Sequence, residues 1–260
     1  MKATTMKDEI FISCYSILDH LTVIRVYDRW NMAEVKEVIP LPANAALEDI
    51  AACSVSNCVY LLFRPYFMFF KIGRVAIDDQ GQFAISHETS DMELQGAAMA
   101  ITASGSVIMS GWLESASLYV IRSYDAIFSL QHEIKCTWLS TMFRPIYAII
   151  PKSSGNLVLS SFSDSAQCYL TEISANGTIL RKYQSSSGPT GRNHCAGVGE
   201  RTLMSESLVK MELLDSEFNL LDFTYSQLAT VPKSLHYNHE RNELITIANS
   251  VLTISKFIDE

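Results

Sequence analysis

The hydrophobic pattern of the chain consists of short runs rich in β-branched and aromatic residues, separated by turn residues. Clear examples are Glu9–Ser13, Leu21–Tyr27, Val59–Phe63 and Leu157–Ser160. Each run is too short for a stable helix and too rich in Val, Ile, Tyr and Phe to favour one. The pattern therefore predicts an all-β protein made of short strands.

These strands repeat with a long period. A strand that contains small residues is followed, after a short turn, by a second apolar strand, and the pair recurs along the chain. The pairs begin at Asp49, Ala97, Ile146, His194 and Ser234, in steps of 48, 49, 48 and 40 residues. Four antiparallel strands in about 40–50 residues make the blade of a β-propeller.

Two further strands complete each unit. The third strand ends near an acidic or turn residue, namely Asp28, Asp78, Asp125, Asn176-Gly177 and Asp215. Asn176-Gly177 is the strongest hairpin signal in the chain. The fourth strands are predicted at Val35–Ile39, Gln82–Ser86, Leu130–Ile134, Thr178–Tyr183 and Leu220–Thr224.

The count predicts a six-bladed β-propeller in a single domain over residues 1–260. Its blades fall near residues 1–40, 48–87, 96–136, 145–184, 193–226 and 233–260. A β-sandwich with accidental regularity is the alternative fold. The last blade reaches only a third strand, Leu252–Phe257, and two arrangements stay open. Either this blade lacks its outer strand, or N-terminal residues supply that strand and the first blade lacks its inner one.

Small residues mark the innermost strand of each blade. Large side chains would collide near the central axis, whereas small ones fit there. The residues concerned are Ala51, Ala52, Ala97, Ala98, Ala148, Ala196 and Gly197.

The chain resembles the NHL-repeat propellers, the six-bladed domains of tripartite-motif proteins. The repeated order of strand, short turn, strand and Asp/Asn-Gly turn carries the resemblance, and it is clearest in Arg144–Ile150, Ser153–Ser160 and Ile173–Leu180. The family's turn motif is blurred in Arg64–Phe70. The resemblance implies the propeller fold and, by analogy, a binding role. The signatures of WD40 and kelch repeats do not occur.

Composition narrows the function classes. Hydrophobic residues make up 48% of the chain and charged residues 18%, which excludes a disordered protein. A net charge of −8 argues against a general nucleic-acid binder. Residues 1–5 carry no apolar signal region, and Val59–Phe70 is too short and too interrupted to span a membrane. We expect a soluble, cytoplasmic protein with reduced cysteines and no membrane partner.

One face of the propeller gathers aromatic residues and arginines. This face carries the turns between second and third strands and the connections from each fourth strand to the next blade. Such residues together are typical of binding hot spots, although aromatics also fill the gaps between blades. The candidate binding residues are Arg64, Tyr66, Phe67, Trp112, Trp138, Arg144 and Arg192, together with His194 at the start of an inner strand.

Cysteines and histidines offer two weaker candidates. Cys53 and Cys58 flank a short turn between adjacent strands, so they are either a disulfide or two buried thiols. The remaining cysteines lack the spacing of a zinc site. His236 and His239 lie three residues apart without nearby ligands, so no metal and no cofactor is expected.

The leading hypothesis is a non-catalytic, monomeric interaction module that binds a protein or peptide. An RNA-binding propeller is the first alternative, using a local patch around Arg64, Arg144 and Arg192, although the net charge disfavours it. A metal-dependent hydrolase of the lactonase or paraoxonase type is the second. It would place a cation in the axial channel, with Glu48, Asp49, Asn193 and Asn238 as ligands. These residues do not recur at matching positions in the blades.

Overall fold

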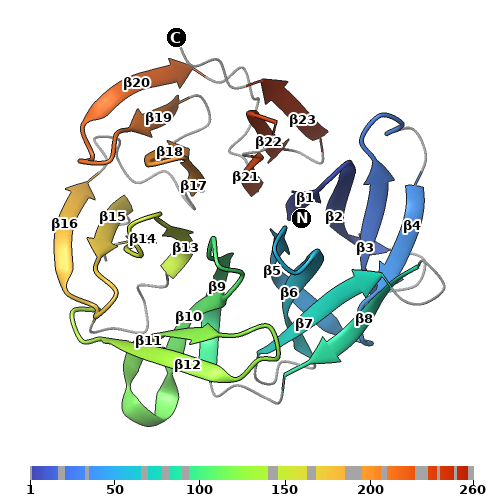
Figure 1. The fold of residues 1–260 in the computed structure, drawn as a ribbon, viewed down its shortest axis with the longest axis horizontal. Helices are drawn as coiled ribbons and strands as arrows, with labels where there is room; N and C mark the ends of the chain where they lie inside the picture. The colour runs from blue at the N-terminus through green and yellow to red at the C-terminus, as the bar shows by residue number, and fades with distance from the viewer. Residues whose placement is uncertain are drawn as a thin grey trace.

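Six antiparallel sheets follow one another around a central axis in the computed structural model (Figure 1). The fold is the expected six-bladed β-propeller. The structure describes residues 2–16, 21–32, 35–65, 70–77, 82–89, 94–139, 146–162, 168–184, 195–205, 210–225, 234–238, 241–248 and 251–256.

Each sheet is formed by consecutive strands, counted outward from the axis. Blade 1 holds β1 (Ala3–Met6), β2 (Glu9–Ser16), β3 (Leu21–Asp28) and β4 (Val35–Pro40). Blade 2 holds β5 (Ala45–Cys53), β6 (Cys58–Pro65), β7 (Lys71–Ile77) and β8 (Phe83–Glu88). Blade 3 holds β9 (Leu94–Ile101), β10 (Val107–Leu113), β11 (Leu118–Tyr124) and β12 (Leu130–Cys136), with a 3₁₀ turn, Glu114–Ala116, before β11.

The second half of the ring repeats this order. Blade 4 holds β13 (Ile146–Pro151), β14 (Leu157–Phe162), β15 (Cys168–Ile173) and β16 (Ile179–Gln184). Blade 5 holds β17 (Cys195–Val198), β18 (Arg201–Ser205), β19 (Lys210–Leu214) and β20 (Leu220–Tyr225). Blade 6 has three strands among the described residues, β21 (Ser234–Asn238), β22 (Glu243–Ala248) and β23 (Val251–Lys256).

The first strand decides between the two arrangements that the sequence left open. β1 pairs with β2 in register from Ala3 opposite Ile12 to Met6 opposite Glu9, so it is the inner strand of blade 1. The arrangement in which N-terminal residues complete blade 6 is therefore wrong. Blades 6 and 1 meet through side chains instead, with Ala3 packed in one cluster with Ile245 and Ile247.

The hydrophobic core is divided among the gaps between neighbouring blades. Each of the six gaps holds its own cluster of buried apolar side chains. Tyr60 of blade 2 and Met109 of blade 3, for example, belong to the cluster between these two blades. Because sheets packed face to face bury both sides of their inner strands, this arrangement accounts for the high apolar content of the chain.

The turns between third and fourth strands explain the acidic residues seen there in the sequence. Asp125 Oδ1 accepts the backbone N–H groups of Ile127 and Ser129, at 3.0 and 2.9 Å. Asp215 Oδ1 accepts those of Glu217 and Asn219 in the same way, both at 2.8 Å. Carboxylates that accept backbone donors two and four residues ahead fix a tight turn.

The same turns also reach the preceding blade. Phe128, in the turn after Asp125, packs edge-to-face on Tyr60 with ring centroids 5.8 Å apart. Phe218, in the turn after Asp215, packs on Tyr183 at 6.5 Å. Each turn therefore stabilises its own blade and holds the neighbouring blade in place.

Candidate functional site

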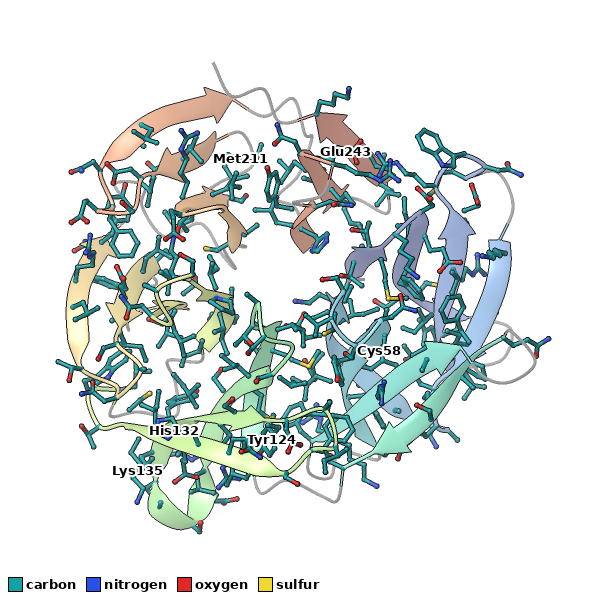
Figure 2. The ribbon with its side chains drawn as sticks, in the orientation of Figure 1. Cys58, Tyr124, His132, Lys135, Met211 and Glu243 are labelled. Carbon is teal, nitrogen blue, oxygen red and sulfur yellow. The ribbon has the colours of Figure 1, made fainter. Side chains whose placement is uncertain are left out.

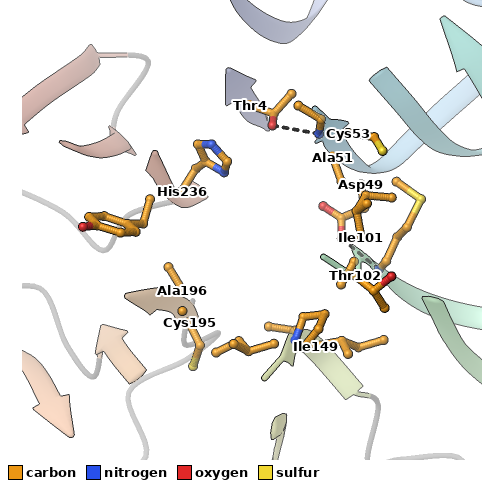
Figure 3. Close-up of a pocket in the computed structure, with 18 of the residues that line it drawn as sticks. Thr4, Asp49, Ala51, Cys53, Ile101, Thr102, Ile149, Cys195, Ala196 and His236 are labelled. Carbon is orange, nitrogen blue, oxygen red and sulfur yellow. Dashed lines mark hydrogen bonds between the residues drawn. The ribbon is translucent and has the colours of Figure 1, made fainter. Parts of the chain in front are cut away.

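A cavity of about 530 Å³ occupies the centre of the ring. Described residues from the inner strands of all six blades line it (Figure 3). The turns that follow β5, β9, β13 and β17 complete its wall. This axial channel is the first candidate site because it is a concave space in which polar groups of several blades converge.

Small residues line much of the channel, as the sequence predicts. Ala51, Ala52, Ala148, Ala196 and Gly197 all contribute to its wall. Gly197 is required by the packing behind the wall, because a Cβ atom there would lie 2.6 Å from Ile150 Cγ2 of blade 4. Ala98 does not line the channel but is buried in the core between blades 3 and 4. The side chain of Ala97 is not among those that the structure describes.

Asp49 makes three polar contacts at the wall of the channel. Its carboxylate accepts hydrogen bonds from the backbone N–H groups of Ile50 and Met99, both at 3.0 Å, and lies 3.5 Å from Lys2 Nζ. Lys2, Asp49 and Met99 belong to blades 1, 2 and 3. The carboxylate therefore ties three successive blades together around the axis.

Threonines of β1 make similar links on either side of blade 1. Thr4 Oγ1 accepts the backbone N–H of Ala52 in blade 2 at 3.1 Å (Figure 3). Thr5 Oγ1 lies 3.1 Å from His236 Nε2 and accepts the Asn238 side-chain amide at 3.1 Å, both from blade 6. These contacts bring the two ends of the ring together at the channel.

Lys152 and Glu200 join blades 4 and 5 at the end of the channel formed by the turns after the inner strands. The Lys152 ammonium donates to the Glu200 backbone carbonyl, and Ser153 donates to the Glu200 carboxylate. Only 8% of Lys152 is exposed, and this burial lowers its pKa from the usual value for a lysine. Lys152 and Glu200 are 48 residues apart, as are Thr4 and Ala52, which is the blade period seen in the sequence.

Three of the four residues suggested as cation ligands are engaged elsewhere. Glu48 lies 3.7 Å from the Arg64 guanidinium, Asp49 links three blades, and Asn238 donates to Thr5. Within the described ranges, no three His, Cys, Asp or Glu side chains come together as a metal site. Asn193 and His239 lie outside the described residues.

The face predicted to bind a partner is only partly described. Tyr66, Phe67, Arg144, Arg192 and His194 lie outside the described residues. Arg64, Trp112 and Trp138 are described. They follow or end second and fourth strands, so the topology brings all three to the same face of the ring.

The three described residues have different surroundings. The Arg64 guanidinium lies over the Phe70 ring at 5.6 Å, and the Lys182 ammonium lies over the Trp138 ring at 5.8 Å. Trp112, in contrast, is 8% exposed and packs edge-to-face on Tyr119, with ring centroids 5.3 Å apart. Its ring fills the gap between blades 3 and 4, and burial raises the pKa of Tyr119 beside it to about 12.

The two cysteines of the β5–β6 hairpin lie opposite each other, as their spacing suggests. The register pairs Cys53 with Cys58, and both are free thiols in the core of blades 2 and 3 (Figure 2). Ser56 contacts both sulfurs, through its N–H to Cys53 Sγ at 3.5 Å and through its hydroxyl to Cys58 Sγ at 3.1 Å. Of the two alternatives, a disulfide or two buried thiols, the structure therefore shows two buried thiols.

Sequence reasoning missed the polar contacts that cross from one blade to the next. Lys2, Lys152 and Glu200 carry no local motif, and only their spacing of about one blade period could have suggested them. Trp30 and Arg29, in the turn between β3 and β4, were also missed. Trp30 is 74% exposed, and both Arg29 and Arg241 lie over its ring, at 5.6 and 5.5 Å.

No protein-family model matches the chain, and no curated protein matches it. Solved structures do. Raptor of Chaetomium thermophilum superposes with a TM-score of 0.63 at 10% identity, over 100% of this chain and 28% of that one. The Cps50 (Swd1) β-propeller domain of Myceliophteria thermophila superposes with a TM-score of 0.62 at 11% identity, over 99% of this chain and 83% of that one.

These likenesses concern the fold, since the sequence identities are so low. The chain spans little more than a quarter of the length of Raptor. With the six sheets and the axial channel, they define the chain as a β-propeller protein. In the described part of the chain, no helix has the length and apolar character needed to cross a membrane.

Proposed function

We propose that this protein is a non-catalytic interaction module that presents the loops of one face to a protein or peptide partner. The observation that carries the proposal is that Arg64 and Trp138 lie on that face and that each takes part in a cation–π contact. Arg64 lies over the ring of Phe70, and Lys182 lies over the ring of Trp138. Arginine and tryptophan are the residues that most often dominate binding energy at protein interfaces.

The rest of the ring supports this role through its rigidity. Side chains of Thr4, Asp49 and Lys152 bond to the backbone of the next blade, so successive blades are held in fixed positions. A rigid scaffold lowers the entropic cost of ordering its loops on binding. An NHL-type identity is part of the proposal, supported by the recurring third-to-fourth strand turns at Asp28, Asp125 and Asp215.

A comparative pull-down tests this function. Arg64→Ala and Arg144→Ala change the proposed face, whereas Lys7→Ala changes an exposed residue in the β1–β2 turn on the opposite face. We expect one set of partners to be retained by the wild type and by Lys7→Ala and to be lost with the two arginine variants. Equal retention by all four proteins would contradict the proposal.

The RNA-binding alternative rests on the arginines of the same face. Arg64 already lies 3.7 Å from the Glu48 carboxylate, which offsets its charge, and the net charge of the chain is −8. Phosphate contacts dominate RNA affinity, so a real site would bind single-stranded RNA with a steep dependence on salt. Binding of that kind, lost in Arg64→Ala, would replace the protein-binding proposal.

We keep a monomeric state and a cytoplasmic location as parts of the proposal. The support for the location is the presence of six cysteines, which stay as thiols in a reducing compartment. Sedimentation at several protein concentrations and localisation of a tagged chain in cells test these two points separately.

A further inference from the structure

Blade 6 differs from the other five at its outer edge. Blades 1 to 5 each have a fourth strand paired to the third, whereas the sheet of blade 6 ends at β23 in the described part of the chain (Figure 1). No residue of β23 is buried, although β3, β11 and β15, which hold the same place in their blades, each have several buried residues. Val251 alone is 61% exposed.

An exposed strand edge presents unpaired backbone N–H and C=O groups and is a template for another strand. From this edge and its surroundings, we propose that β23 takes up an extended segment of a partner protein as the fourth strand of blade 6. This mode of binding supplies main-chain hydrogen bonds, and side chains on alternate positions supply specificity. The surface is distinct from the loop face and does not depend on the function proposed for that face.

In blades 4 and 5, the turn between the third and fourth strands contacts the fourth strand of the preceding blade. In blade 5, Ser216 and Glu217 of the β19–β20 turn bind Arg181 of β16, the fourth strand of the preceding blade, at 2.9 and 2.5 Å. In blade 4, Ala175 of the β15–β16 turn lies 3.2 Å from His132 of β12 in the same way.

The equivalent turn of blade 1 carries Arg29 and Trp30 and faces blade 6. This turn contacts Glu243 of β22 and Arg241 of the β21–β22 turn, both of which lie nearer the axis than a fourth strand would. Trp30 itself is 74% exposed at this junction between blades 1 and 6, so its emission is a reporter of binding there.

One fourth strand of this chain, β16, indicates what the partner segment looks like. In β16, residues alternate between half-buried and exposed, with Ile179, Arg181 and Tyr183 turned inward. On β23, Leu252 and Ile254 already pack toward the cluster shared with blade 1. The partner segment therefore has apolar residues at alternate positions to extend that cluster, and polar residues between them.

The charges on neighbouring strands add one further requirement for the sequence of the partner segment. Third and fourth strands carry opposite charges across from each other in blades 3 and 4, where Arg122 pairs with Glu133 at 2.8 Å and Glu172 with Arg181 at 2.9 Å. Lys256 is the one charged residue of β23 and is exposed. An acidic residue of the partner opposite Lys256 completes the same arrangement, because opposite charges across a strand pair are stabilising.

A synthetic peptide with the sequence of residues 178–184, which includes β16, is the probe. The peptide carries two basic residues, Arg181 and Lys182, so its charge can be tested against either sign at position 256. It is added to the full chain and to the Lys256→Glu variant, and hydrogen exchange of the amides of 251–256 is measured in each.

We expect the peptide to slow exchange in β23 about tenfold when it is present at about ten times its Kd. It should bind about fivefold more tightly to the Lys256→Glu variant than to the wild type, because opposite charges across a strand pair are stabilising and like charges are not. The same peptide with N-methyl groups on alternate residues keeps its side chains but loses the backbone donors, and it should not bind. Emission of Trp30 should shift on binding, and this shift should disappear in Trp30→Phe while the amide protection stays.

Three results would overturn the proposal. Unchanged exchange of 251–256 at saturating peptide would show that the edge does not accept a strand. Slow exchange in the free monomer would show that the chain covers this edge itself. Slow exchange that grows with protein concentration, together with a dimer in sedimentation, would identify a second copy as the occupant. Variants of the loop face such as Arg64→Ala should leave all these measurements unchanged.

Discussion

Arg29 of blade 1 and Glu243 of blade 6 form an ion pair across the junction where the ring closes. Glu243 is labelled in Figure 2. Their side chains are only 9% and 10% exposed. Arg29 Nη1 and Glu243 Oε2 are buried without a hydrogen-bond partner among the described residues. The pair is therefore incompletely satisfied, and the desolvation of both charges offsets much of their attraction.

This geometry predicts that removing one charge of the pair destabilises the fold more than replacing both residues by apolar ones. Glu243→Gln leaves the Arg29 charge buried and unpaired, and we expect the free energy of unfolding to fall by about 3 kcal/mol. The double variant Arg29→Met with Glu243→Leu removes both charges and should recover most of that loss. Chemical denaturation of the two variants measures the difference.

A second ion pair at the same junction provides the control. Arg241 and Asp8 also join blades 6 and 1, but their side chains are 30% and 55% exposed. Asp8→Asn should therefore change stability by less than about 1 kcal/mol. A loss for Glu243→Gln as small as that for Asp8→Asn would contradict the role given to the buried pair.

The strands and their grouping into blades could be predicted because their signals are local. Alternating residues and turn residues at Asp125, Asn176-Gly177 and Asp215 mark hairpins without reference to distant parts of the chain. The contacts between blades have no such signal. The hydrogen bonds of Thr4 to Ala52 and of Lys152 to Glu200 form only once the blades have packed side by side. The sequence shows the 48-residue spacing of these partners but not that they bond.

The candidate site was predictable to a similar extent. The topology of the strands places Arg64 and Trp138 on one face, as their positions in the repeat predict. Whether an aromatic ring on that face meets solvent or fills a gap depends on the neighbouring blade. Trp112 is buried against Tyr119, whereas Trp138 is only half-buried against the same cluster, and no pattern within blade 3 alone distinguishes the two.

Cysteine reactivity tests how the core is buried. Cys14 is half-buried, whereas the other five cysteines are buried. Burial raises the pKa of the Cys136 thiol to about 12, and that of Cys195 is raised further. A thiol with such a pKa holds about a thousandfold less thiolate at neutral pH than a free cysteine.

We therefore expect iodoacetamide at pH 8 to modify Cys14 first in the folded protein and all six cysteines in urea. Mass spectrometry of the digested protein identifies each modified residue. Cys14→Ser should remove the early modification and leave the slow ones unchanged. Modification of Cys136 or Cys195 in folded protein at the rate of Cys14 would show that the gaps between blades open readily.

The β19–β20 turn should make stability depend on pH in acid. The pKa of the Asp215 carboxyl is lowered, first by the hydrogen bond from the Asn219 side chain and also by the backbone N–H groups of Asn219 and Glu217. Because its pKa is lower in the folded state, Asp215 stabilises the fold above its ordinary pKa. That stabilisation is lost as the pH falls through the lowered folded value.

Asp215→Asn should consequently be less stable than the wild type at pH 7, and the difference should shrink on titration to pH 3. Asn219→Ala, which removes the first cause of the shift but keeps the backbone donors, should show a smaller effect of the same sign. Urea denaturation across this pH range measures both. A difference between wild type and Asp215→Asn that does not change with pH would exclude this titration as its cause.

Two glycines separate the cost of backbone conformation from the cost of packing between blades. Gly177, in the β15–β16 turn, has φ +85°, and Gly155, in the β13–β14 turn, has φ +83°. A Cβ atom at Gly155 would meet nothing within 4 Å, whereas one at Gly177 would lie 2.5 Å from Ile134 Cγ2 of blade 3. The two positions thus share a backbone conformation and differ in their neighbours.

We expect Gly155→Ala to lower the free energy of unfolding by about 1 kcal/mol, the cost of a left-handed conformation for a residue with a Cβ atom. Gly177→Ala should lose about 1–3 kcal/mol more, because the buried Ile134 must move to admit the methyl group. Parallel urea denaturation of the two variants gives the packing contribution as the difference between them. Equal losses of stability would mean that blade 4 can move away from blade 3 with little loss of free energy. The contact between Gly177 and Ile134 would then not fix the relative position of the two blades.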